Sequence, residues 1–241
     1  MGLADDRARI SAKPKMTGFL ASVTGPKEAE VAVTGGADII DLKNPLTGAL
    51  GALPFETIKA SVEIVNKRTI TSATIGDLPP DPARVVQAVR KMKTTGVEII
   101  KIGFFQAVDY RPLIDALTHE ASKRQLVAVL FADQQPNLDL LPHLAACGFY
   151  GVMLDTATKD GGGLLGNMET SIISGFLLNA RQAGLVSGLA GQLTAEDISI
   201  LLPLKPDYLG FRSALCRNNN RKSNLDIEAI GRIKHIIAEG S

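Results

Sequence analysis

The chain has 241 residues, 45% of them hydrophobic, and its 26 basic and 25 acidic side chains give a formal net charge of +1. This length and apolar content suit one large α/β domain or two small ones. The balanced charge and the lack of charge blocks argue against nucleic acid and membrane surfaces as partners. Residues 1–15 are polar and lack the apolar centre of a signal peptide, so we expect a cytoplasmic protein.

Short runs rich in β-branched residues alternate with longer amphipathic segments. The short runs predict strands at Thr17–Ser22, Ala37–Lys43, Thr69–Ala73, Val97–Ile102, Leu126–Phe131, Gly151–Leu154, Val186–Ala190 and Tyr208–Phe211. The amphipathic segments predict helices at Lys27–Thr34, Phe55–Asn66, Pro82–Thr95, Tyr110–Lys123, Leu138–Cys147, Glu169–Ala183, Ala195–Leu202 and Asp226–Ala238. Strand followed by helix, repeated eight times, predicts an α/β fold with a single (β/α)8 TIM barrel over residues 16–241, after a flexible extension of residues 1–15. A doubly wound open sheet is the alternative.

The loops after the predicted strands differ from the loops after the helices. Long loops rich in glycine and polar residues, such as 44–52, 159–166 and 212–224, follow strands, whereas short plain loops follow helices. Barrel enzymes carry their sites in the loops at the carboxyl ends of the strands. The sequence therefore predicts a site on that side of the barrel.

Lysines and aspartates gather on the same side. Lys43 and Lys101 end apolar runs, and Lys159 lies four residues after Asp155, which ends a third. Because side chains on a strand alternate between its two faces, Asp41 shares a face with Lys43. The three runs are the second, fourth and sixth strands, and alternate strands of a barrel contribute to the same interior layers. We therefore expect Lys43, Lys101 and Asp155 to converge at one opening.

This group has the chemistry of a Schiff-base site. Two ammonium groups a few ångströms apart repel, and burial also disfavours their charged form, so one lysine can lose its proton and attack a carbonyl. The second lysine can then act as a general acid or base, with Asp41, Asp155 and Lys159 in supporting roles. The alternative is that Asp41–Lys43 and Asp155–Lys159 are ordinary ion pairs at strand ends.

A phosphate site is predicted after the last two strands. Gly191 and Gln192 follow the seventh strand, and Gly210, Arg212 and Ser213 end or follow the eighth. Loops at these positions commonly bind phosphate through backbone N–H groups, and Arg212 offers a charged fork. Ordinary turns are the alternative explanation of the glycines.

Three further polar residues after strands have two interpretations. Thr74 and Asp77 follow the third strand, and Asp133 follows the fifth. They can contact a substrate, or they can serve as turn and cap residues.

Metal and nicotinamide chemistry find no support in the sequence. Cys147 and Cys216 form no CxxC pattern, and His119, His143 and His235 lack ligand spacing. No GxGxxG follows a predicted strand. We therefore expect no metal and no cofactor.

Several stretches of the chain resemble the (5-formylfuran-3-yl)methyl phosphate synthase family, the furan-forming enzymes of methanofuran biosynthesis. They are Gly35–Pro45 with Gly48–Ala52, Ser72–Asp77, Ile100–Gly103, Met153–Gly161 and Leu189–Gly191. The resemblance extends over nearly the whole chain from Gly18 onward. It implies a (β/α)8 barrel and a cofactor-free lyase that joins two molecules of glyceraldehyde 3-phosphate with loss of phosphate and water.

The resemblance also implies roles for individual residues. Lys43 matches the Schiff-base lysine, and Lys101 matches a second catalytic lysine that accepts a proton. Asp41, Asp155 and Lys159 match supporting positions in the active site. The chain departs from the family after Arg212, where Ser213 replaces a common glycine and residues 217–222 do not align.

Two other functions remain compatible with these residues. One is a class I, Schiff-base aldolase acting on another phosphosugar, and the other is a non-catalytic barrel that binds phosphosugars. In each case the partner is a small phosphorylated molecule such as a triose phosphate. The sequence allows a homo-oligomer without indicating an interface, and it leaves open which lysine is neutral at rest.

Overall fold

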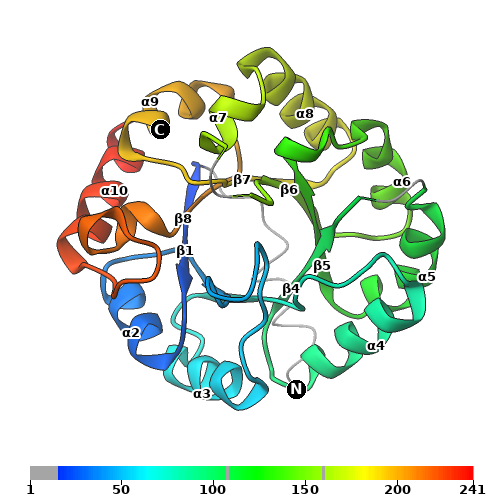
Figure 1. The fold of residues 1–241 in the computed structure, drawn as a ribbon, viewed down its shortest axis with the longest axis horizontal. Helices are drawn as coiled ribbons and strands as arrows, with labels where there is room; N and C mark the ends of the chain where they lie inside the picture. The colour runs from blue at the N-terminus through cyan, green and yellow to red at the C-terminus, as the bar shows by residue number, and fades with distance from the viewer. Residues whose placement is uncertain (1–15, 107–108, 159–160, 241) are drawn as a thin grey trace.

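Eight parallel strands close into a barrel in the computed structural model, which describes residues 16–106, 109–158 and 161–240 (Figure 1). Each strand pairs with the next along the chain, and β1 pairs with β8. The strands are β1 Gly18–Val23, β2 Ile39–Leu42, β3 Ile70–Thr74, β4 Ile99–Phe104, β5 Gln125–Phe131, β6 Gly151–Asp155, β7 Val186–Leu189 and β8 Tyr208–Phe211. The predicted TIM barrel is confirmed, and the open sheet is excluded. The predicted extension, residues 1–15, lies outside the described residues.

Helices form a ring around the barrel (Figure 1). They are α2 Pro26–Thr34, α3 Phe55–Val65, α4 Pro82–Lys93, α5 Arg111–Ala121, α6 Leu141–Ala146, α7 Gly163–Asn167, α8 Thr170–Gln182, α9 Ala195–Leu201 and α10 Ile227–Glu239. Proline lies in the first turn of α2, α4, α5 and α6. A helix accepts proline there because the first N–H groups have no partner within the helix.

Two helical segments differ from the prediction. The segment predicted as one helix over Leu138–Cys147 is a 3-10 turn, Leu138–Leu140, followed by α6. Pro142 in the first turn of α6 explains where the α-helix begins, because proline fits only there. The short helix α7 was not predicted, because its glycine-rich sequence carries a turn signal rather than a helical pattern.

Alternation along the strands separates two hydrophobic cores. Leu20, Ile39, Ile99 and Met153 belong to a cluster inside the barrel. The residues that follow them along each strand, such as Ile40 and Ile100, belong to the larger core between the strands and the helices. Because Ile39, Ile99 and Met153 lie two residues before Asp41, Lys101 and Asp155, these three polar side chains share the inward face.

Acidic side chains fasten the strands at the amino-terminal end of the barrel. Asp38 accepts the backbone N–H of Phe19 at 2.7 Å, Glu98 accepts that of Thr71 at 2.8 Å, and Asp207 accepts that of Ser187 at 2.7 Å. Each acid lies just before a strand, β2, β4 or β8, and binds the backbone of the previous strand, β1, β3 or β7. This end of a TIM barrel serves stability, which leaves the opposite end for chemistry.

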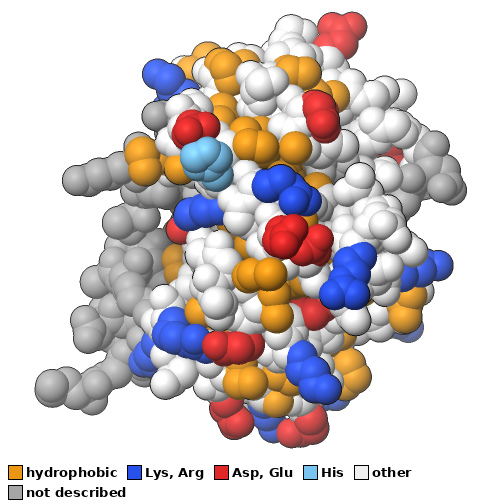
Figure 2. All heavy atoms as spheres, turned by 90° about the vertical axis from the view of Figure 1, so that its left-hand side faces the viewer, with side chains coloured by type: hydrophobic (Ala, Val, Ile, Leu, Met, Phe, Trp, Pro, Cys, Tyr) orange, Lys and Arg blue, Asp and Glu red, His pale blue; other side chains and the backbone are white. Residues whose placement is uncertain are grey.

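The outer surface mixes charges of both signs. Figure 2 shows basic, acidic and hydrophobic side chains interspersed over the face formed by α10 and α2. Within residues 16–106, 109–158 and 161–240, no helix has the length and apolar character needed to span a membrane.

Candidate active site

Four of the five predicted catalytic residues form two buried ion pairs, with side chains from β2, β4 and β6 and from Lys43 directly after β2. Lys101 Nζ lies 2.9 Å from Asp41 Oδ2, and Lys43 Nζ lies 3.5 Å from Asp155 Oδ2. All four are buried, and Lys43 has the largest exposed fraction, 8%. The structure therefore brings these residues together as two pairs, Asp41 with Lys101 and Asp155 with Lys43. Lys159 lies outside the described residues.

Asp41 is surrounded by donors from three other strands, β1, β3 and β4. Its carboxylate accepts hydrogen bonds from Ser72 Oγ at 2.6 Å, Lys101 Nζ at 2.9 Å and Ser22 Oγ at 3.3 Å. Ser22 and Ser72 are the direct partners of Asp41 in the registers of β1 and β3. Neither serine could be predicted from the sequence, because only the register between strands brings them to Asp41. The alternative Asp41–Lys43 ion pair is wrong, since Asp41 pairs with Lys101.

The two lysines occupy different environments. Lys101 lies within β4, which continues to Phe104 rather than ending at Ile102 as predicted. Its side chain lines an apolar cavity inside the barrel with Ile39 and Ile99. Lys43 follows β2 and lines a second, more polar pocket. Its contact with Asp155 is long, and the other oxygen of Asp155 accepts the N–H of Thr156 at 2.7 Å. Lys43 is thus the lysine that faces the polar pocket, and its ion pair is longer than that of Lys101.

All the residues predicted to bind phosphate line the pocket of Lys43 and Asp155. They are Gly191, Gln192, Gly210, Arg212 and Ser213, and Ser22 and Arg221 lie with them. Gly191 has a φ of +105°, and a Cβ there would lie 3.0 Å from the methyl carbon of Thr156. Glycine is therefore needed at this position, and it brings the backbone close to the pocket.

The guanidinium of Arg212 is not the free fork that the sequence predicted. Its Nη1 and Nη2 bind Glu28 in a bidentate pair at 2.6 and 3.2 Å. The remaining N–H groups donate to the carbonyls of Ser22, Arg221 and Ser223. Because a guanidinium has five N–H donors, the set is fully used within the protein. Arg212 therefore joins the loop after β8 to β1 and α2 and has no donor left for a phosphate.

Two polar residues, Thr74 at the end of β3 and Asp77 after it, anchor the loop that follows Lys43. Asp77 accepts the N–H groups of Ala49 at 2.9 Å and Leu50 at 2.7 Å, and Thr74 Oγ1 donates to the carbonyl of Gly51 at 3.1 Å. Leu50 is fully buried and joins the barrel-interior cluster. These contacts agree with turn and cap roles for Thr74 and Asp77, and they position the chain that follows Lys43.

Asp133 anchors the loop after β6 in the same way. It accepts the N–H groups of Ala157 at 2.8 Å and Thr158 at 2.7 Å, and the hydroxyl of Thr158 at 2.8 Å. Burial raises the pKa of Asp133, but these hydrogen bonds outweigh it, so the net pKa lies below the usual value. The carboxylate holds the backbone that leads from Asp155 toward position 159.

Comparisons with known proteins agree with this architecture. A family model described as 4-HFC-P synthase matches residues 19–234. The chain is 43% identical over 218 residues to a Methylorubrum extorquens protein provisionally assigned as a (5-formylfuran-3-yl)methyl phosphate synthase, covering 90% of this chain and 88% of the relative. It is 34% identical over 233 residues to the (5-formylfuran-3-yl)methyl phosphate synthase of Methanocaldococcus jannaschii, covering 90% of this chain and 98% of the relative.

Solved structures of other enzymes share the fold. Phosphoribosyl anthranilate isomerase from Thermotoga maritima aligns with a TM-score of 0.67 at 12% identity, covering 93% of this chain and 100% of that chain. Thiamine phosphate pyrophosphorylase from Pyrococcus furiosus aligns with a TM-score of 0.64 at 11% identity, covering 95% and 98%. At these identities the likeness concerns the barrel fold alone.

We predict that Glu28 and Glu30, both on α2, differ strongly in their contribution to stability. Glu28→Gln leaves Arg212 as a largely buried cation with a weakened partner, because the two side chains of this pair are only 13% and 8% exposed. We expect a loss of about 3 kcal/mol in the free energy of unfolding, measured in urea. Glu30→Gln is the matched control: it removes an exposed pair with Arg68 and should change little. Equal effects would contradict the structural role of Arg212.

We also predict that the contribution of Asp133 to stability depends on pH. Its pKa is lower in the folded protein than in the unfolded chain, so the stabilisation is present above the unfolded pKa, about 4, and is lost as the pH falls through the folded value. The measurement is the free energy of unfolding of wild type and Asp133→Asn between neutral pH and pH 3. The difference between the two proteins should shrink below about pH 4. A difference that stays constant would show that the carboxylate charge is not involved.

Proposed function

The chain belongs to the 4-HFC-P synthase family, and from this membership we propose that it forms (5-formylfuran-3-yl)methyl phosphate. The proposed substrate is glyceraldehyde 3-phosphate. Two molecules combine through a Schiff base on Lys43, and the products are the furan aldehyde phosphate, one phosphate and two waters. The observation that carries the proposal is a buried lysine, paired with a carboxylate, that faces a glycine-lined polar pocket.

Lys43 is the better nucleophile of the two lysines on geometric grounds. Its ion pair with Asp155 is long at 3.5 Å, whereas Lys101 donates to Asp41 at 2.9 Å. A lysine must give up a proton before its nitrogen can attack a carbonyl. Asp155 can accept that proton and return it to the hydroxyl of the carbinolamine, which leaves as water when the imine forms. Lys43 also lines the pocket that a substrate would enter.

Lys101 and Asp41 act as one proton-accepting unit in this proposal. The imine on Lys43 makes the neighbouring C–H acidic, and its proton must go to a base. An ammonium cannot accept a proton, so Lys101 first passes one to Asp41 along their 2.9 Å hydrogen bond. The neutral amine then takes the substrate proton, and the resulting enamine attacks the aldehyde of the second triose phosphate. Ser22 and Ser72 keep Asp41 oriented during both transfers.

The remaining steps need an anion site and repeated proton transfers. Phosphate elimination, ring closure and dehydration convert the six-carbon intermediate into the furan. The glycines after β7 and β8 support a phosphate site beside Lys43, because they let backbone N–H groups approach the ligand closely. Lys159 is proposed as an additional proton donor or acceptor on the strength of the family resemblance. The product would serve methanofuran or a related one-carbon carrier.

We predict turnover of glyceraldehyde 3-phosphate as the only substrate. Purified protein should release phosphate and produce a furan absorbance together. Lys43→Arg should abolish both, because the guanidinium keeps the charge but cannot form an imine. The assay follows phosphate and absorbance in parallel.

Each other outcome of this assay has a meaning. Substrate loss without a furan, with both phosphates retained in the product, would favour a class I aldolase. No turnover at all would favour a non-catalytic phosphosugar-binding barrel, and furan formation by Lys43→Arg would remove Lys43 from the mechanism.

A further inference from the structure

Among the described residues, one cation that lines the pocket makes no hydrogen bond or ion pair through its side chain. Arg221 lies in the loop between β8 and α10 and lines the pocket with Lys43 and Asp155. Its side chain is partly buried, and its guanidinium makes no hydrogen bond or ion pair with another residue of the described ranges. Burial lowers the pKa of Arg221, and Asp155 opposes that effect. A partly desolvated guanidinium without a partner is costly, and an anion in the pocket would offset that cost.

The backbone that carries Arg221 is fixed while its side chain is left free. Arg212 donates to the carbonyls of Arg221 at 2.9 Å and Ser223 at 3.1 Å. An antiparallel bridge between Cys216 and Leu225 closes the base of the loop. The loop is therefore a preorganised support that holds the Arg221 guanidinium at the pocket, and such support lowers the entropic cost of binding a ligand.

We propose that Arg221 binds the phosphate group of the substrate, in the role that the sequence assigned to Arg212. This inference rests on the proposed function, and the ligand class is a phosphate monoester. The planar guanidinium can bind two phosphate oxygens at once, and the backbone near Gly191 and Gly210 completes the site. Lys43 lies on the same pocket, so a phosphate held by Arg221 directs the carbonyl end of a triose toward the amine. Arg221 is a specificity residue that selects phosphorylated aldehydes.

Binding of inorganic phosphate tests Arg221 without requiring turnover. Calorimetry on the full-length protein should show phosphate binding weakened roughly 10- to 100-fold in Arg221→Gln, the loss expected for charge-assisted hydrogen bonds. Lys222→Gln is the matched control, because Lys222 is the exposed neighbour and is absent from the pocket. Arg221→Lys should bind with intermediate affinity, since an ammonium keeps the charge but loses the fork. Unchanged phosphate binding in Arg221→Gln would overturn the proposal.

Kinetics separates this proposal from the proposed function. With glyceraldehyde 3-phosphate, Arg221→Gln should raise KM by a similar factor and change kcat less, and phosphate should inhibit it more weakly than the wild type. If the wild type binds phosphate through Arg221 but turns over no triose phosphate, the anion site stands and the proposed reaction fails. If turnover occurs and KM is unaffected by Arg221→Gln, the reaction stands and the role of Arg221 fails.

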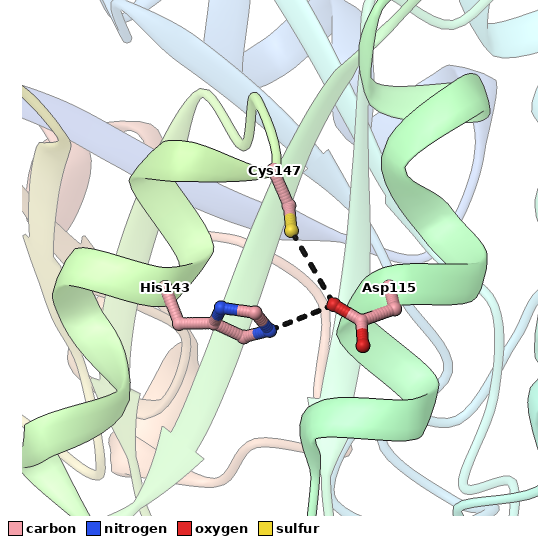
Figure 3. A group of neighbouring side chains, drawn as sticks. All are labelled: Asp115, His143 and Cys147. Atoms are coloured by element: carbon pink, nitrogen blue, oxygen red, sulfur yellow. Dashed lines mark hydrogen bonds and ion pairs between the residues drawn. The ribbon is translucent and has the colours of Figure 1, made fainter.

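A second, independent inference concerns the outer surface between α5 and α6. Figure 3 shows Asp115 on α5 pointing toward His143 and Cys147, which lie four residues apart on α6 and at its end. Asp115 Oδ1 is 2.8 Å from His143 Nε2 and 3.7 Å from Cys147 Sγ. All three ligand atoms lie within 4.8 Å of one another. The sequence predicted no metal site, because the spacing between ligands on two helices is not visible in the chain.

We infer that these three side chains form a Zn²⁺ site that links α5 to α6. Tetrahedral zinc with bonds of about 2.0–2.3 Å places its ligands roughly 3.3–3.6 Å apart. The separations of Asp115 from the other two, 2.8 and 3.7 Å, bracket this range, so small side-chain movements would complete the site. Thiolate, imidazole and carboxylate together suit zinc. Histidine and cysteine four residues apart share one face of a helix, as in other helical zinc sites. Three protein ligands leave the fourth position to water.

Cobalt provides a direct spectroscopic test of this site. Chelator-treated, reduced protein titrated with Co²⁺ should develop the thiolate-to-cobalt absorption band, and equimolar Zn²⁺ should remove it. Cys147→Ser should abolish the band and His143→Gln should weaken it. Cys216→Ser is the control, because that thiol is buried at the β8–α10 loop. Zinc should also raise the Tm of the wild type and leave that of Cys147→Ser unchanged. Absence of the band, or its persistence in Cys147→Ser, would leave the group as an ordinary ion pair.

Discussion

The buried pair of Asp41 and Lys101 is the constraint on which the rest of the site depends. Two opposite charges inside a barrel are tolerated only when their hydrogen-bonding groups find partners. The carboxylate of Asp41 accepts hydrogen bonds from the hydroxyls of Ser22 on β1 and Ser72 on β3, and from the ammonium of Lys101 on β4. With Asp41 committed to Lys101, Lys43 pairs with Asp155 among the residues that the structure describes. The division of the two lysines into a tightly held one and a loosely held one follows from that pairing.

The same division recurs among the arginines after β8. Arg212 is engaged with Glu28 and with three backbone carbonyls, so it closes the seam between the last and first strands. The backbone carbonyl of Arg221 accepts a hydrogen bond from Arg212, and the side chain of Arg221 lines the pocket. One arginine thus supports the loop, and the other faces the ligand space.

The Zn²⁺ site inferred between α5 and α6 lies on the outer ring of helices, so its effect on stability can be measured independently of catalysis.

Much of this architecture could be predicted from the sequence, because it depends on patterns within single segments. The eight strands and the inward direction of Asp41, Lys101 and Asp155 follow from apolar runs and alternation. What escaped prediction depends on pairs of distant segments. Ser22 and Ser72 reach Asp41 through strand register, and Glu28 reaches Arg212 across the closing seam of the barrel. The choice of Lys101 as the partner of Asp41 likewise required the position of β4, which continues beyond its predicted end.

We propose Lys43 as the amine that forms the imine. Borohydride reduction of the protein during incubation with glyceraldehyde 3-phosphate, followed by peptide mapping with mass spectrometry, tests this directly. We expect a reduced triose phosphate adduct on Lys43, none on Lys101, and none in Lys43→Arg. An adduct on Lys101, or a protein that turns over substrate without any trapped adduct, would contradict it.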